Sequence, residues 1–121
     1  MRMTRDQHRA RYAYERVARI AEGPTAKDYK IVVMGIGANI MRSGLASAIA
    51  FLERRNSPAV VSFLDDLSGA SIPGLEEAKG ENLPDRVRNL TDLDAYMLAT
   101  RETLRVALWF RRAVQALVRD K

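Results

Sequence analysis

The sequence predicts an all-α protein: a compact bundle of five or six helices with a long C-terminal helix. Apolar residues recur at helical spacing along most of the 121 residues. Glycine and proline fall between these segments, where helices stop and start. Because a chain of this length is expected to form one domain, we assign residues 1–121 to a single helical domain.

The first predicted helix spans about residues 4–21. Its apolar face is assigned to Met3, Ala10, Ala13, Tyr14, Val17, Ala18 and Ala21. Off that face, the spacing predicts a stripe of arginines that includes Arg5, Arg9 and Arg16. The Gly-Pro pair at 23–24 is expected to end the helix, because glycine suits a C-terminal cap and proline cannot continue the helix.

The second predicted helix runs from about residue 25 to the break expected at Gly44. Its apolar positions follow helical spacing: Tyr29, Val33, Ile36 and Ile40. Thr25 is the expected N-cap, with Asp28 in the capping-box position. A third helix over about 45–54 is predicted to bury Leu45, Ile49 and Leu52, with Phe51 beside them.

Two further helices flank a loop. Ser57 and Pro58 form the start of one helix, as N-cap and first helical residue, and Gly69 ends it. Its apolar face is assigned to Val60, Phe63, Leu64 and Leu67. Residues 70–83 contain glycine, proline and three glutamates and are predicted to form an acidic loop, and Leu83-Pro84 opens a short helix to about residue 90.

The last predicted helix, about residues 92–118, separates two faces most clearly. Thr91 is its expected N-cap, with Asp94 three residues later. The core face is assigned to Ala99, Thr103, Val106, Ala107, Phe110, Ala113, Val114 and Leu117. Arg101, Arg105 and Arg112 fall on the opposite face with Arg119. This helix therefore offers a core face and a face suited to an anionic partner.

Charge is distributed unevenly along the chain. Residues 1–19 and residues 101–121 each carry a net charge of +4, whereas residues 20–100 carry −3. Sixteen of the twenty basic residues are arginine, whose forked guanidinium suits phosphate oxygens. A GC-rich genome would also favour arginine, but it does not explain the clustering at the two ends.

One segment imitates a nucleotide-binding motif. Residues 30–40 resemble a strand that leads into a glycine-rich turn, with Gly35 and Gly37 in place. A dinucleotide fingerprint needs a third glycine or alanine where Ile40 stands, within a strand–helix–strand unit that the surrounding pattern does not support. We therefore predict a buried helix whose glycines allow a neighbouring helix to pack closely.

No set of residues resembles a catalytic or metal site, and no cofactor is expected. His8 is the only histidine, and cysteine is absent, so a histidine-based triad and a thiolate metal site are excluded. Asp65 and Asp66 are neighbours on a helix and cannot face each other as an acid and base pair. The two arginine stripes, with Tyr12 and Trp109 beside them, instead favour contacts to nucleic-acid phosphates and bases. Solvated helix faces are the alternative interpretation of both stripes.

Three segments together resemble one family. They are Ala13-Tyr14-Glu15-x-Val17; Ile40-Met41-Arg42-Ser43-Gly44-Leu45 with Ala50-Phe51-Leu52; and Tyr96-x-x-Ala99-Thr100-Arg101-Glu102-x-Leu104 with Leu108-Trp109-Phe110-Arg111-Arg112-Ala113. In this order and spacing the chain resembles the small all-helical subunit of the type III-B CRISPR effector, the Cmr RNA-silencing complex. One departure is Ser43, where the family often has asparagine, and it affects only a helix junction.

The resemblance implies a non-enzymatic subunit that stacks with further copies of itself. Such subunits hold the paired crRNA and target RNA through a basic surface and contact other subunits of the effector. From the arginine stripes we take six candidate RNA contacts: Arg5, Arg9, Arg16, Arg101, Arg105 and Arg112. From the acidic middle we take Glu76, Glu77 and Glu81 as candidate contacts between copies, because each copy in a head-to-tail stack presents two different surfaces.

Two other functions fit parts of the sequence. A helical DNA-binding regulator would need a polar recognition helix after Gly44, but that helix is dominated by alanine and leucine. A protein-interaction adaptor would use the arginines for acidic partners. The first residues contain no apolar stretch typical of a signal peptide, and the longest apolar run is too short for a membrane span, so we expect a cytoplasmic protein with no membrane contact.

Overall fold

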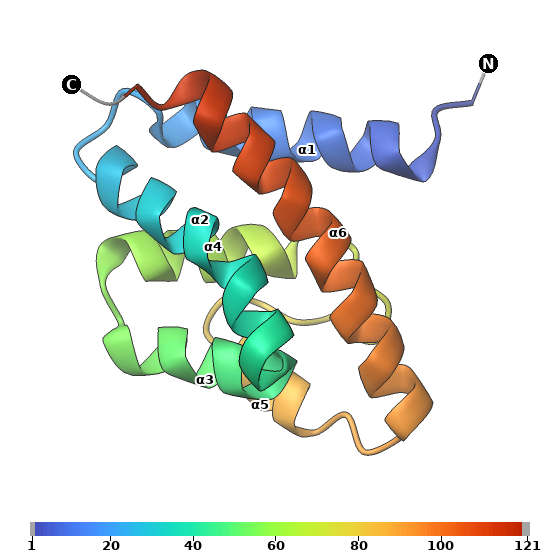
Figure 1. The fold of residues 1–121 in the computed structure, drawn as a ribbon. Helices are drawn as coiled ribbons and strands as arrows, with labels where there is room; N and C mark the ends of the chain where they lie inside the picture. The colour runs from blue at the N-terminus through green and yellow to red at the C-terminus, as the bar shows by residue number, and fades with distance from the viewer. Residues whose placement is uncertain (1, 120–121) are drawn as a thin grey trace.

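A computed structural model describes residues 2–119 and confirms the all-α prediction. Six helices occupy this range, and their order is shown in Figure 1. Their bounds are α1 Arg5–Ile20, α2 Ala26–Ser43, α3 Leu45–Arg55, α4 Pro58–Ser68, α5 Leu83–Arg88 and α6 Leu93–Leu117. Each lies within a few residues of its predicted range. None of these helices is both long and apolar enough to cross a membrane.

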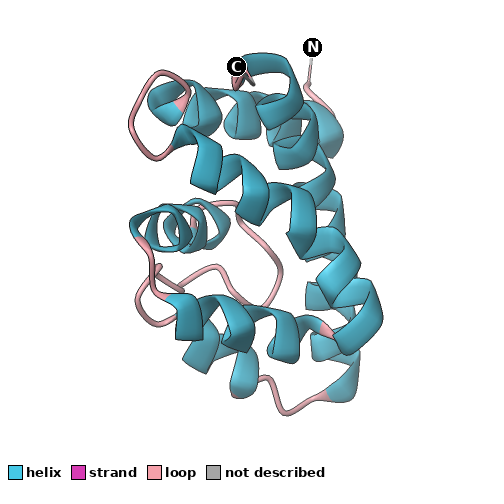
Figure 2. Cartoon of the chain, turned by 60° about the vertical axis from the view of Figure 1, so that its left-hand side comes forward, coloured by secondary structure: helices cyan, strands magenta, loops and turns pink. Residues whose placement is uncertain are grey.

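Helix α2 lies between α6 and α4, with α1 packed across α6 (Figures 1 and 2). Aromatic rings join these layers: Phe63 of α4 meets both Tyr29 of α2 and Phe110 of α6, edge to face at 5.8 Å between ring centroids. Tyr12 of α1 meets Phe110 in the same manner at 6.1 Å. Edge-to-face pairs add stability beyond the area they bury. The core is therefore fixed by one chain of four rings from four helices.

Of the three N-caps predicted from the sequence, only Ser57 makes its expected side-chain hydrogen bond. The Ser57 hydroxyl accepts a hydrogen bond from the Val60 amide, as predicted. Thr25 makes no side-chain cap, and α6 begins after Asp92 rather than Thr91, also without a side-chain cap. The reciprocal capping box is instead at α1, where Thr4 and Gln7 bond each other's amides. Thr25 is therefore confirmed as the N-cap residue of α2, but its predicted side-chain cap is not formed. The prediction of Thr91 as the N-cap of α6 is wrong, because the threonine–aspartate spacing alone does not set where the helix begins.

Helix α1 is rotated relative to the predicted orientation. Ala13 and Val17 are fully buried as expected, but Tyr14 and Ala18 face solvent. Arg9 takes the inward position one turn before Ala13 and is only 8% exposed. The expectation that Arg9 lies on an exposed stripe is therefore wrong. Arg9 is buried because its guanidinium meets the buried carboxylate of Glu102.

The junction between α2 and α3 depends on a tyrosine from α6. Gly44 has a φ of +88°, a conformation that favours glycine, and separates the two helices. The hydroxyl of Tyr96 accepts a hydrogen bond of 2.9 Å from the Ala46 amide and so caps the start of α3. Two of the three family-like segments thus meet at this point.

The glycines of α2 do not serve close packing, contrary to the prediction. Residues 30–40 are helical throughout, as expected. A Cβ atom at Gly37 would meet nothing within 4 Å, and one at Gly35 would meet only the Asn39 side chain at 3.9 Å. Gly37 instead leaves open space between α2 and α6. Phe51 is also exposed rather than part of the core.

Candidate nucleic-acid interface

The arginines of α6 form an exposed row. Arg101, Arg105 and Arg112 are all exposed, on the face opposite the buried Phe110. Among residues 2–119, no carboxylate pairs with Arg101 or Arg112. The Arg112 guanidinium lies over the Trp109 ring, 4.8 Å from its centroid. This contact orients a cation at the surface without neutralising its charge.

The first arginines of α1 converge on one buried acid. Glu102 of α6 is 2% exposed and accepts a hydrogen bond of 2.7 Å from Nη1 of Arg5. Nη2 of Arg9 lies 3.5 Å from the same Oε1 atom, and Nη1 of Arg105 lies 3.4 Å from Oε2. Three guanidiniums surround a single carboxylate, so the cluster keeps an excess of positive charge.

The charge of Glu102 is maintained by these neighbours. Burial alone would raise the pKa of Glu102, but the attraction and hydrogen bond of Arg9, joined by the charges of Arg105 and Arg5, lower it below its ordinary value. Glu102 is therefore ionised at neutral pH and holds α1 against α6. Arg9 keeps one nitrogen, Nη1, without a hydrogen-bond partner among the described residues.

Arg16 belongs to a second buried cluster. Its Nε donates a hydrogen bond of 2.6 Å to Oδ1 of Asp66, and Tyr29 donates to the other carboxylate oxygen. Tyr12 donates to the Asp66 backbone carbonyl at 2.7 Å. The hydrogen bond to Asp66 raises the pKa of Arg16, while burial raises the pKa of Tyr12 and Tyr29. Arg16, which is partly buried, thus joins α1 to α4.

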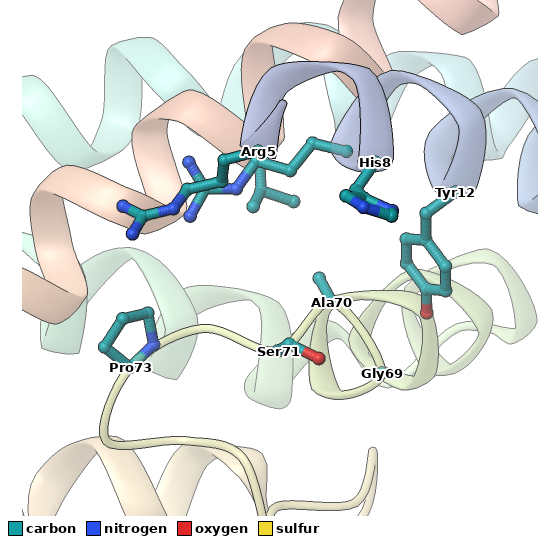
Figure 3. A pocket seen from close by; sticks show the side chains of 9 residues that line it. Arg5, His8, Tyr12, Gly69, Ala70, Ser71 and Pro73 are labelled. Carbon is teal, nitrogen blue, oxygen red and sulfur yellow. The ribbon is translucent and has the colours of Figure 1, made fainter. Parts of the chain in front are cut away.

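A hollow of about 570 Å³ opens between α1 and the segment that follows α4. Figure 3 shows Arg5, His8 and Tyr12 on one side and Gly69, Ala70, Ser71 and Pro73 on the other. A Cβ at Gly69 would collide with the Tyr12 hydroxyl, so a larger residue there would displace Tyr12 from its hydrogen bond to Asp66. His8 is exposed. Arg5 and Arg9 both line the hollow and both reach Glu102.

The acidic loop presents its charges to solvent. Glu76, Glu77 and Glu81 are all exposed, while Ile72 and Leu75 anchor the loop in the core. The Glu76 carboxylate accepts a hydrogen bond of 2.7 Å from the Gly74 amide. The candidate subunit contacts are therefore accessible.

Sequence reasoning missed the two buried acids that organise α1. Asp66 lies three residues after Phe63, and Glu102 three residues after Ala99, so both fall on the core faces of their helices. This spacing was the signal that distinguishes Asp66 from the exposed Asp65. Of the six candidate arginines, the structure places Arg9 inside, Arg16 partly inside, and the other four at the surface.

These features match a known family over nearly the whole chain. The family model for the CRISPR-associated protein Cas_Cmr5 matches residues 5–117. The chain belongs to the Cas_Cmr5 family. The CRISPR system Cmr subunit Cmr5 of Thermus thermophilus is 32% identical over 117 residues, which are 97% of this chain and 98% of that protein.

A solved structure of the family has the same fold. The crystal structure of a CRISPR-associated Cmr5 family protein from Thermus thermophilus superposes with a TM-score of 0.86 at 30% identity, covering 98% of this chain and 100% of that one. The resemblance inferred from the three sequence segments is therefore confirmed. The residues that carry it include Gly44 and Tyr96 at the α2–α3 junction, and Arg101 and Glu102 on α6.

Proposed function

We propose that this protein is a non-catalytic small subunit of a type III-B CRISPR (Cmr) ribonucleoprotein effector. In this role it stacks with further copies of itself and stabilises the crRNA paired with target RNA. The observation that carries the proposal is the row of exposed arginines on α6, in a chain of the Cas_Cmr5 family. The curated relative is named a subunit of the Cmr system, which supports assembly with other subunits.

The exposed arginines suit an RNA backbone. Arg101, Arg105 and Arg112 repeat at intervals of four and seven residues, so they follow one side of α6 for about three turns. Arg5 adds a fourth exposed guanidinium beside Arg105, because both contact Glu102. Guanidiniums bind phosphate oxygens in pairs of hydrogen bonds and carry no sequence preference when they contact only the backbone.

Arg9 and Arg16 have a supporting role in this proposal. Arg9 is buried against Glu102, and Arg16 is partly buried and bonded to Asp66, so both are less exposed than the other four candidates. They position α1 against α6 and α4 and so hold Arg5 at the surface. The six candidate arginines thus divide into four contacts and two supports.

The proposal is tested first by purification of a tagged chain from its native host. We expect co-purification with larger CRISPR proteins and short repeat-tagged guide RNAs, identified by mass spectrometry and sequencing. Recovery of the chain alone, or with duplex DNA, would contradict the proposal and favour the DNA-binding regulator.

The contact between copies is tested by charge reversal in the acidic loop. Glu76, Glu77 and Glu81 are exposed and lie in the acidic middle of a chain with two basic ends. We propose that they meet a basic surface of the next copy. Changing all three to lysine is expected to lower incorporation into the purified complex, and unchanged incorporation would rule out this loop as the contact.

A further inference from the structure

We infer that the hollow between α1 and the segment that follows α4 binds a nucleoside monophosphate group. The phosphate lies at the basic side chains of α1, and the nucleoside ring lies against Tyr12. The inference does not rest on the proposed contact between the α6 arginines and an RNA backbone. A free nucleotide and a phosphorylated end of an RNA strand both carry this chemical group.

One face of α1 supplies the basic side chains of the hollow. Four residues that line it occupy positions i, i+3, i+4 and i+7 of the helix: Arg5, His8, Arg9 and Tyr12. Figure 3 shows His8 and Tyr12 directed toward the segment 69–73. Among the described residues, none that lines the hollow carries a carboxylate. The lining therefore offers cations and hydrogen-bond donors to the oxygens of a ligand.

The charge of the arginine cluster favours a phosphate monoester. Arg5, Arg9 and Arg105 all lie within 3.5 Å of the Glu102 carboxylate. Three cations and one anion leave an excess of two positive charges, and Arg5 and Arg9 carry part of that excess into the lining of the hollow. A phosphate monoester carries a charge of about −1.5 to −2 near neutral pH. A phosphate within an RNA backbone carries only about −1 and matches this excess less well.

Several polar groups of the hollow lack a partner within the fold. Arg9 is 8% exposed, and its Nη1 makes no hydrogen bond to any described residue. The side chains of His8 and Ser71 likewise make none within residues 2–119. Because a buried donor without an acceptor is unfavourable, a ligand oxygen beside Arg9 would supply what the protein itself does not.

Ser71 holds an unusual backbone conformation opposite α1 (Figure 3). Its φ of +57° lies in the left-handed region, which few residues other than glycine adopt. Such conformations persist where the surrounding structure imposes them, and they are frequent where ligands bind. Here Gly69, packed against Tyr12, and the buried Ile72 fix the chain on either side of Ser71. The segment therefore presents Ser71 to the hollow at a defined position.

The apolar part of the hollow fits a flat ring. It is formed by Tyr12, Ala70, Pro73 and Val106. The Tyr12 hydroxyl donates a hydrogen bond of 2.7 Å to the Asp66 carbonyl, so the ring is held in place before a ligand binds. Nucleobases stack on such rings. The volume of about 570 Å³ lies within the range of about 300–1,000 Å³ typical of small-molecule sites.

Calorimetric titration of the full-length protein tests the inference with three probes: adenosine monophosphate, adenosine and inorganic phosphate. We expect adenosine monophosphate to bind at least about tenfold more tightly than either of the others, because only this probe fills both parts of the hollow. No binding of adenosine monophosphate would overturn the inference. Equal affinities for adenosine monophosphate and inorganic phosphate would also overturn it, since the ring would then contribute nothing.

Ser71 provides a matched pair of variants that differ in charge. Aspartate and asparagine have similar size and both tolerate a positive φ, so Ser71→Asp and Ser71→Asn should keep the fold, as circular dichroism would verify. Ser71→Asp places a carboxylate beside the phosphate and should lower the affinity for adenosine monophosphate about tenfold, whereas Ser71→Asn should retain it within about threefold. Equal affinities of the two variants would overturn the placement of the phosphate.

A second pair of substitutions distinguishes the hollow from the α6 arginines. Arg101→Gln with Arg112→Gln changes two exposed residues that do not line the hollow, so the affinity for adenosine monophosphate should stay the same. A loss as large as that in Ser71→Asp would show that the nucleotide binds the α6 arginines and would overturn the inference.

Competition by short RNA strands distinguishes the two sources of the nucleotide group. Displacement of adenosine monophosphate only by RNA with a terminal phosphate would support an RNA end as the ligand, and no displacement by either RNA would support a free nucleotide. Equal displacement by RNA with and without that phosphate would assign the hollow to the RNA backbone and overturn the inference. RNA binding without nucleotide binding would reject the hollow and leave the proposed function standing, and the reverse result would do the opposite.

Discussion

The arginines of α1 and α6 follow similar patterns in the sequence but differ in what surrounds them. Arg9 and Arg16 face buried carboxylates, Glu102 and Asp66, that lie on other helices. Arg101 and Arg112 face solvent and have no carboxylate partner among residues 2–119. Arg9 and Arg16 thus stabilise the fold, whereas Arg101 and Arg112 keep unmatched charges at the surface. The comparison teaches that similar arginine spacing does not decide which guanidinium is buried, because the acid that meets it comes from another helix.

Glu102→Ala is expected to lower the free energy of unfolding more than any other single change considered for these arginine clusters. The change leaves the Arg9 guanidinium buried without its acidic partner, which costs about 3–5 kcal/mol of unfolding free energy. Urea unfolding followed by circular dichroism measures it. Adding Arg9→Met removes the unpaired buried charge and should recover most of the lost stability. A single variant as stable as the unchanged chain would show that Arg9 does not depend on Glu102.

Asp66→Ala should have the next largest effect. Tyr29 would lose the acceptor of its buried hydroxyl, for a loss of about 2–3 kcal/mol, while Arg16, about a third exposed, can turn to water. The neighbouring Asp65→Ala is the control, since Asp65 is exposed and should change stability by less than about 0.5 kcal/mol. Equal losses from both variants in thermal unfolding would contradict the assignment of Asp66 to the core.

The pH dependence of stability tests the pairing of Glu102 with its arginine neighbours. Because the folded protein lowers the pKa of Glu102 below its ordinary value of 4.5, its contribution is complete above that pH and is lost as the pH falls through the folded value. The unchanged chain should therefore lose more stability than Glu102→Gln between about pH 6 and pH 3. Urea midpoints that fall in parallel for the two proteins would count against this coupling.

The smallest effect on folding is expected from the α6 arginines. Arg101→Gln with Arg112→Gln removes two surface charges that bind no acid within the described residues, so the free energy of unfolding should change by less than about 0.5 kcal/mol apart from a small loss at Trp109. Thermal unfolding checks it. A loss of several kcal/mol would place these arginines among the structural ones.

The sequence predicted the helices and most of the core, because apolar spacing and the glycine and proline positions are local signals. It did not predict the rotation of α1. Arg5 and Glu102 are 97 residues apart, and nothing within either segment alone indicates that they meet. The open space at Gly37 and the cap from Tyr96 onto Ala46 likewise depend on how α2, α3 and α6 come together. The exposed row on α6 was predictable because one helix defines it.

The central claim is that the α6 arginines bind RNA, and the salt dependence of RNA binding tests it most directly. If about four phosphates are neutralised per copy, the logarithm of affinity should fall against that of salt with a slope near −3. Arg101→Ala with Arg105→Ala and Arg112→Ala should flatten that slope by about 2. A control with the same charge change, Arg55→Ala, Arg86→Ala and Arg54→Ala on α3 and α5, should leave the slope at about −3. An α6 variant with unchanged affinity and slope, or a control that flattens it equally, would contradict the account.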